Sequence, residues 1–198
     1  MMLSLVPSER FEAWIESLPN LNDLSISRCF KPTDFTHIDT QLHLFCDASR
    51  TGYGCASYLH MVDYNNKIHV VFVRGISRVT PKQPITIPRL ELVSAVAAAE
   101  LGRSIVSELS YKIDKVLYWT DFTSVLQFLN NRSESFKTFV ANRVNTIHLL
   151  SRPEQWLHVG SKQNPADIAS RGIMPNKVSK SALAHLIFQS LGILFRLS

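Results

Sequence analysis

Apolar residues recur at helical spacing in two segments of the chain. Phe11, Trp14, Ile15 and Leu18 stand at i, i+3, i+4 and i+7, which predicts a helix near the start. Pro88 suits the first turn of a longer helix over residues 89–109, whose apolar positions form one stripe. Shorter helices are predicted over residues 122–129, 136–150 and 166–172.

Strands are predicted where short runs of apolar, aromatic and β-branched residues lie between turn-forming residues. The sequence Asp-Tyr-Asn-Asn at 63–66 indicates a hairpin, and residues 77–88, with three prolines, are expected to be irregular. The predicted strands are residues 41–47, 55–62, 67–74, 115–120 and 155–159.

The resulting order of elements is β-β-β-α-β-α-α-β-α. Three strands joined by hairpins, followed by strands that alternate with helices, favour a mixed five-stranded sheet covered by helices. We therefore expect a three-layer α/β/α domain over residues 41–172. Residues 1–40 then form a helix with a connector, and residues 173–198 form a C-terminal tail.

Composition narrows the class of protein. The 198 residues allow one domain with short additions, and the 45% of apolar residues can form a core. The three cysteines lack the spacing of a zinc site, so we interpret them as small buried hydrophobes. No segment offers the ~20 apolar residues of a membrane span, and no secretory signal is expected. A net charge of +5 is compatible with a polyanionic partner without requiring one.

Four carboxylates stand where predicted elements begin or end. Asp47 and Asp121 each follow a strand, Glu91 lies in the first turn of the long helix, and Asp167 opens the last helix. Singly, each has an ordinary role as a turn former, a cap or an acid favoured by a helix dipole. Four like charges in one place would repel strongly unless cations lay between them. An all-oxygen ligand set selects Mg²⁺ or Mn²⁺.

Short motifs around these acids give the chain a family resemblance. Asp-Ala-Ser at 47–49, Arg-Leu-Glu-Leu at 89–92, Thr-Asp at 120–121 and Ala-Asp at 166–167 resemble the retroviral-type ribonuclease H. Longer motifs narrow the resemblance to the ribonuclease H-like region of Pao/BEL-class LTR retrotransposon polyproteins. These motifs are Ile87–Leu92, Tyr118–Asp121, Ala141–Val144 and Asn164–Gly172.

The resemblance implies a ribonuclease H-like fold and a metal-binding tetrad. That tetrad falls on Asp47, Glu91, Asp121 and Asp167, which would hold two Mg²⁺ ions, with Mn²⁺ as the other candidate. The implied activity is endonucleolytic hydrolysis of the RNA strand of RNA–DNA hybrids during reverse transcription. A metal-activated water would attack the phosphorus and leave a 3′-hydroxyl and a 5′-phosphate.

The resemblance also implies a place in a longer polyprotein. The region would follow a reverse transcriptase and precede an integrase, so both are expected partners beside the RNA–DNA hybrid. Residues 1–40, including the segment 24–28, then resemble the end of a connection from the polymerase. The expected location is the cytoplasm, in the retrotransposon particle, with the nucleus as the alternative, and no membrane partner is expected.

A hybrid-binding protein needs groups that contact the 2′-hydroxyl and the phosphates. Ser49 and Thr86 are candidates, and the resemblance implies a phosphate or sugar contact for Thr86. Both hydroxyls are equally consistent with an ordinary turn or loop. Arg89 either contacts phosphate or balances the charge of a neighbouring acid. Asn142 and Arg143 are candidates because they belong to a family-like motif.

Three features depart from the family's pattern. Phe122 stands after Asp121 where many ribonucleases H have serine, and its ring either crowds the site or packs in a helix core. His158 is interpreted as a structural residue of a strand, which leaves the loop before Asp167 without a histidine for proton transfer or product release. The tail over 181–198 lacks the Trp and Gly-Pro with which the family continues.

Two other classes of function stay open. The chain can be a ribonuclease H-like module that binds nucleic acid with weak or no catalytic activity, as a degenerate fragment of a polyprotein. An absence of Mg²⁺ binding with retained hybrid binding would favour that module. Integrase and transposase cores share the fold, but they use an Asp-Asp-Glu order, whereas Glu91 comes second here.

Overall fold

The computed structural model describes residues 7–22, 29–31, 37–81, 83, 85–110, 112–131 and 136–177. The segment 24–28, which resembles a polymerase connection, and the tail beyond residue 177 lie outside the described residues.

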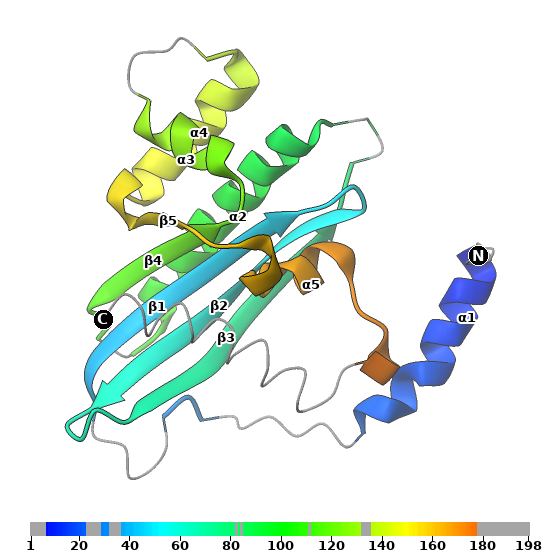
Figure 1. The fold of residues 1–198 in the computed structure, drawn as a ribbon, viewed down its shortest axis with the longest axis horizontal. Helices are drawn as coiled ribbons and strands as arrows, with labels where there is room; N and C mark the ends of the chain where they lie inside the picture. The colour runs from blue at the N-terminus through cyan, green and yellow to red at the C-terminus, as the bar shows by residue number, and fades with distance from the viewer. Residues whose placement is uncertain are drawn as a thin grey trace.

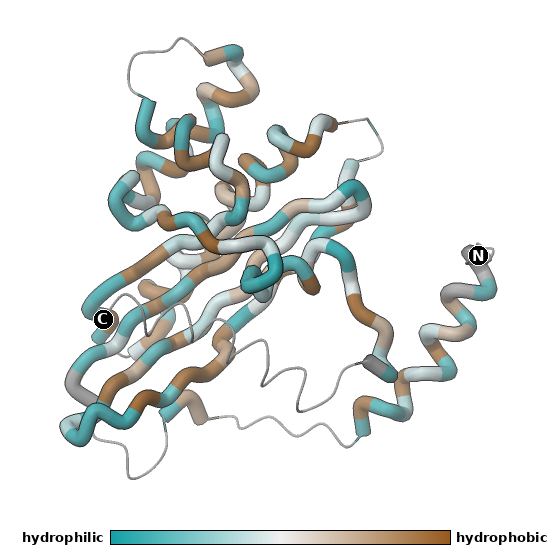
Figure 2. Tube along the Cα trace, viewed as in Figure 1, coloured by the Kyte–Doolittle hydropathy of each residue, from teal (hydrophilic) through white to brown (hydrophobic). Residues whose placement is uncertain are grey.

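Three antiparallel strands form one half of a five-stranded sheet (Figure 1). The predicted hairpin between the second and third strands is present. Asp63 Oδ1 accepts the N–H groups of Asn65 and Lys67, and Asn66 adopts a φ of 57°. Figure 2 shows this polar turn followed by an apolar run on the third strand. The strands are β1 (His37–Ala48), β2 (Gly52–Asp63) and β3 (Ile68–Val79).

The other half of the sheet is parallel, and the strand order is β3-β2-β1-β4-β5. The two parallel strands are β4 (Lys115–Thr120) and β5 (Trp156–His158). The helices that connect or follow the strands are α2 (Ile87–Glu108), α3 (Thr123–Asn130), α4 (Thr138–Leu150) and α5 (Ala166–Arg171). Short 3₁₀ turns are η1 (Leu18–Leu21), η2 (Pro153–Gln155), η3 (Ser161–Gln163) and η4 (Pro175–Lys177).

The sheet buries a different set of side chains on each face, because successive residues of a strand point in opposite directions. Leu42 and Leu44 of β1 pack on one side against α2, whose Leu92 is fully buried. Phe45 and Trp119 belong to the core of the other side, which α5 joins through Ala166 (0% exposed). The predicted mixed sheet and three-layer α/β/α architecture are therefore confirmed.

Several boundaries differ from the predicted ones. β3 continues to Val79 rather than ending at residue 74, because Gly52–Gly54 of β2 provide pairing partners for Ser77–Val79. The helix α2 begins at Ile87 instead of residue 89, which moves Glu91 out of the first turn.

The N-terminal helix α1 (Pro7–Ser17) lies away from the sheet (Figure 1). The helix was predicted from its apolar spacing, yet Phe11, Trp14 and Ile15 are all exposed. Cys29 is exposed as well, which corrects the interpretation of all three cysteines as buried. Within the described residues, no helix combines the length and the hydropathy needed to cross a membrane.

Candidate metal centre

β1 carries Asp47 to the edge of the sheet at which the parallel strands end. Asp47 is the second-last residue of β1 and stands opposite Gly54 of β2. It shares one face of the strand with Phe45, whose ring packs in the core. The apolar residues before Asp47 thus fix its direction, and only 4% of Asp47 is exposed.

Asp121 reaches the same edge because β1 and β4 are parallel. Cys46 stands opposite Thr120, so the residues that follow them, Asp47 and Asp121, are neighbours at the carboxyl ends of the two strands. The N–H of Phe122 donates to Thr120 Oγ1 at 3.2 Å, which helps to turn the chain into α3.

Glu91 comes from α2 and lies two residues further into the helix than the sequence predicted. Thr86 is the N-cap with an extended backbone, and Pro88 lies in the first turn. Glu91 is 4% exposed and lies on the buried side of the helix between Leu90 and Leu92. Its carboxylate accepts a hydrogen bond from the backbone N–H of Ala48 at the end of β1.

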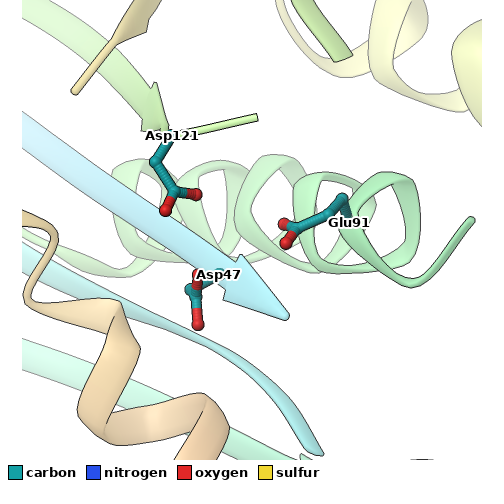
Figure 3. A group of neighbouring side chains, drawn as sticks. All are labelled: Asp47, Glu91 and Asp121. Atoms are coloured by element: carbon teal, nitrogen blue, oxygen red, sulfur yellow. The ribbon is translucent and has the colours of Figure 1, made fainter. Parts of the chain in front are cut away.

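The three acids form one group. Asp47, Glu91 and Asp121 each offer a carboxylate oxygen, and these oxygens lie within 4.8 Å of one another. Figure 3 shows the side chains turned toward one another from β1, from α2 and from the end of β4. Glu91 Oε2 is buried and has no hydrogen-bond partner. A buried acceptor without a hydrogen-bond partner destabilises the fold unless it binds a proton or a cation.

The electrostatics of the group favour binding of a positive charge. Burial, followed by the charges of Asp47 and Asp121, raises the pKa of Glu91 to about 8. Burial also raises the pKa of Asp47 to about 6, although a hydrogen bond from Ser170 opposes the rise. Oxygen ligands without histidine or cysteine suit Mg²⁺ and Mn²⁺. The residues present therefore fit a divalent metal centre.

Asp167, the fourth predicted ligand, lies outside this group. It stands on α5 with a side chain that is 45% exposed, and its Oδ1 accepts the Nε–H of Arg171 at 2.5 Å. Its charge still helps to raise the pKa of Asp47, so it lies near the site. The structure thus brings three of the four predicted ligands together, and the ligand role of Asp167 stays a prediction.

Ser170 and Asn164 are site residues that sequence reasoning missed. The Ser170 hydroxyl donates to Asp47 Oδ2. Asn164 Nδ2 donates to the carbonyl of Cys46 at 2.9 Å, and its Oδ1 accepts the N–H of Ala166 at 3.1 Å. Both residues lie in the motif over 164–172, where small polar side chains at helical spacing from Asp167 were the available signal.

Ser49 and Thr86, the candidates for sugar contacts, have different surroundings. Ser49 is buried, and its Oγ donates to the carbonyl of Ser170 at 2.8 Å and accepts the N–H of Gly52 at 3.1 Å. The hydroxyl therefore ties the turn after β1 to α5. Thr86 is exposed, and its side chain makes no capping hydrogen bond. Substrate contact stays a prediction for both.

Arg89 and Arg143 meet at one aromatic ring. The guanidinium carbons of Arg89 and Arg143 lie 5.0 and 3.5 Å from the centroid of Phe139, and Arg143 also donates to the Phe139 carbonyl at 3.1 Å. Burial, followed by the charge of Arg89, lowers the pKa of Arg143. In the described parts of the chain neither arginine has an acidic partner. Asn142 is exposed on α4 beside them.

The family model described as the Pao retrotransposon-like RNaseH-like domain matches residues 3–122. The chain belongs to this family. The matched residues include Asp47, Glu91 and Asp121, whereas Asp167 lies beyond them. The ribonuclease H-like fold implied by the sequence motifs is therefore confirmed. No curated protein matches this sequence.

This chain is also similar to several solved structures. Ribonuclease H1 from Halobacterium salinarum is 14% identical, with a TM-score of 0.42 over 67% of this chain and 94% of that chain. LC11 ribonuclease H1, solved in complex with an RNA/DNA hybrid, is 10% identical, with a TM-score of 0.45 over 71% and 100%. The protease–reverse transcriptase of prototype foamy virus is 11% identical, with a TM-score of 0.32 over 83% and 23%.

The structure describes two of the residues that depart from the family pattern, Phe122 and His158. Phe122 is partly buried and packs against the core on the α2 side, which favours the packing interpretation over crowding of the site. His158 lies in β5, as predicted, and pairs with Thr120, which directly precedes Asp121. Its side chain is exposed rather than packed, and the pairing with Thr120 places it near the edge from which the acids emerge.

Proposed function

We propose that this Pao domain is a ribonuclease H that hydrolyses the RNA strand of RNA–DNA hybrids during reverse transcription. One observation carries the proposal: three carboxylate oxygens lie within 4.8 Å of one another at the carboxyl ends of β1 and β4. The unpaired, buried Glu91 Oε2 within that group supports a cation as the missing partner.

In this proposal Asp47, Glu91 and Asp121 hold a divalent cation, and Asp167 joins them for a second one. Two bound Mg²⁺ ions would supply an activated water and neutralise charge on the leaving oxygen, yielding a 3′-hydroxyl and a 5′-phosphate. The protein's own contribution is orientation. The Ser170 hydroxyl directs Asp47, and the Ala48 N–H directs Glu91 so that Oε2 stays available.

Substrate binding is proposed for the surface beside α2 and α4. The cations Arg89 and Arg143 lie on Phe139 without an acidic partner among the described residues, an arrangement that suits backbone phosphates. The exposed side chains of Thr86 and Asn142 extend this surface. Ser49 contributes indirectly, by holding α5 in place, because its hydroxyl donates to the Ser170 carbonyl.

We further propose that the reverse transcriptase and integrase parts of the same polyprotein are partners in the cytoplasmic particle. Support comes from α1, where Phe11, Trp14 and Ile15 are exposed together in the segment assigned to the polymerase connection. Exposed apolar side chains gathered on one element are typical of interaction surfaces.

The test is cleavage of a labelled RNA–DNA hybrid by the purified chain in Mg²⁺. We expect Asp121→Asn to reduce the rate by about 100-fold or more, because a lost ligand removes several kcal/mol of charge stabilisation. Glu154→Gln is the matched control, since Glu154 is exposed in η2 at the opposite end of the parallel strands. Equal cleavage by wild type and Asp121→Asn would refute the proposal.

One observation favours a second candidate, a module that binds nucleic acid without turnover. Asp167 is bonded to Arg171 rather than grouped with the other acids, so the tetrad is incomplete. Calorimetry separates the candidates. Hybrid binding without any Mg²⁺ binding at millimolar concentration would identify the module, whereas Mg²⁺ binding with hybrid cleavage would identify the nuclease.

A further inference from the structure

The ion pair of Asp167 and Arg171 lies beside the three-acid group without belonging to it. Both residues are on α5, four positions apart, and the side chains of Asp167 and Arg171 are 45% and 63% exposed. The same turn of α5 supplies the Ser170 hydroxyl that donates to Asp47. The element that orients one acid of the group therefore also engages the fourth acid with a cation.

The charge of Arg171 extends beyond its partner. It lowers the pKa values of Asp47 and Glu91 against the effect of burial, and its own pKa is raised by Asp167 first and by Asp47 and Asp121 as well. Among the residues that the structure describes, Arg171 is the basic residue that forms an ion pair next to the three acids. It acts as a counter-ion for the site as a whole.

We propose that Arg171 competes with the second divalent cation for Asp167. This inference rests on the proposed function, because it assumes that the acids bind metal. Asp47, Glu91 and Asp121 take the first ion while Asp167 stays on Arg171. The second ion gains the Asp167 carboxylate only when that carboxylate leaves the guanidinium, and it also meets the repulsion of a nearby positive charge. Arg171 thus weakens the second site selectively.

The test is a titration of the full chain with Mn²⁺. Binding is measured by calorimetry and by the electron paramagnetic resonance signal of free Mn²⁺. We expect Arg171→Gln to tighten the weaker of two binding steps by about 1.5-fold to fivefold, the range that loss of an exposed ion pair can supply. The stronger step changes less. Arg103→Gln is the matched control, because Arg103 is exposed on α2, about 18 Å along the helix from Glu91.

A double-mutant cycle shows whether the effect passes through Asp167. Asp167→Asn should weaken or abolish the second step, and Arg171→Gln added to it should not restore that step. If Arg171→Gln tightens the second step equally in the Asp167→Asn background, the arginine acts as a diffuse charge and competition for Asp167 is refuted.

Other outcomes separate this inference from the proposed function. An unchanged or weaker second step in Arg171→Gln, with Mn²⁺ binding and hybrid cleavage by the wild type, overturns the competition alone. A wild-type chain that binds no Mn²⁺ overturns both the metal centre and the competition built on it.

Discussion

Glu91 places its carboxyl group on the buried side of α2, next to Asp47 and Asp121, and its own Oε2 has no hydrogen-bond partner. With a pKa of about 8, it holds a proton at neutral pH when no cation is bound. The folded chain therefore binds more protons than the unfolded chain between the ordinary pKa of 4.5 and 8. The stability that this proton provides is lost as pH rises through that window, and a bound cation would restore it.

Metal binding should release this proton. At pH 7 we expect about one proton to leave per Mg²⁺ bound in the first step, because the cation requires the carboxylate form. The affinity for Mg²⁺ should rise from pH 6 to about pH 8 and then level off. Calorimetry in two buffers of different ionisation enthalpy measures the release. Glu91→Gln should bind more weakly and release less, and pH-independent binding by the wild type would contradict the account.

At the scale of elements, the position of α5 depends on close contact with the sheet. A Cβ at Gly54 would lie 2.8 Å from the Cβ of Ala169, and one at Gly52 would lie 2.8 Å from the carbonyl oxygen of Ser170. Only glycine lets α5 lie this near the beginning of β2. That contact places the Ser170 hydroxyl against Asp47.

Gly54→Ala should therefore displace α5 and also disturb the neighbouring part of β3, because the added Cβ would lie closer still to the carbonyl oxygen of Ile76. We expect a loss of about 1–3 kcal/mol in the free energy of unfolding, the usual cost of overpacking, together with weaker Mg²⁺ binding as Asp47 loses its donor. Urea unfolding and calorimetry measure the two effects. Gly160→Ala is the control, because Gly160 has a φ of −68° and its added Cβ would meet only the end of Gln163, at 3.3 Å. Equal stability and equal Mg²⁺ binding of Gly54→Ala and wild type would show that neither β3 nor α5 needs this close approach.

The sequence predicted the elements well where the pattern is local. The order of strands and helices follows from periodicity and turn residues, and Asp47 and Asp121 follow apolar strands whose parallel pairing brings them to one edge. Contacts between distant segments have no such local signal. The hydrogen bond from Ser170 to Asp47, for example, joins residues 123 positions apart. The ion pair of Asp167 with Arg171 is local by contrast, because its i,i+4 spacing on α5 can be read from the sequence.

At the scale of the whole molecule, the net charge of +5 is distributed unevenly around the site. Asp47, Glu91 and Asp121 lie together at the edge of the sheet. Arg89 of α2 and Arg143 of α4 both lie against the ring of Phe139. A polyanion would thus be held by the arginines while a cation occupies the acids. The salt dependence of hybrid binding reports the arginine contribution separately from metal binding.

The double variant Arg89→Gln/Arg143→Gln should weaken binding of the hybrid and leave the first Mn²⁺ step unchanged. The slope of log K against log salt should fall in magnitude by about 1–2, since each phosphate contact contributes about 0.9. Fluorescence anisotropy across a salt series measures the slope. Arg103→Gln, exposed on another part of α2, should leave it nearly unaltered. An unaltered slope in the double variant would place the phosphate contacts elsewhere.

The central claim is that Asp47, Glu91 and Asp121 together bind a divalent cation. The most direct measurement is the anomalous scattering of Mn²⁺ in crystals of the full chain. We expect a peak among the three carboxylates, within coordination distance of the buried Glu91 Oε2, and its loss in Asp47→Asn crystals. A fully soaked crystal with no peak at these residues, or a peak that persists in Asp47→Asn at the same height, would contradict the claim.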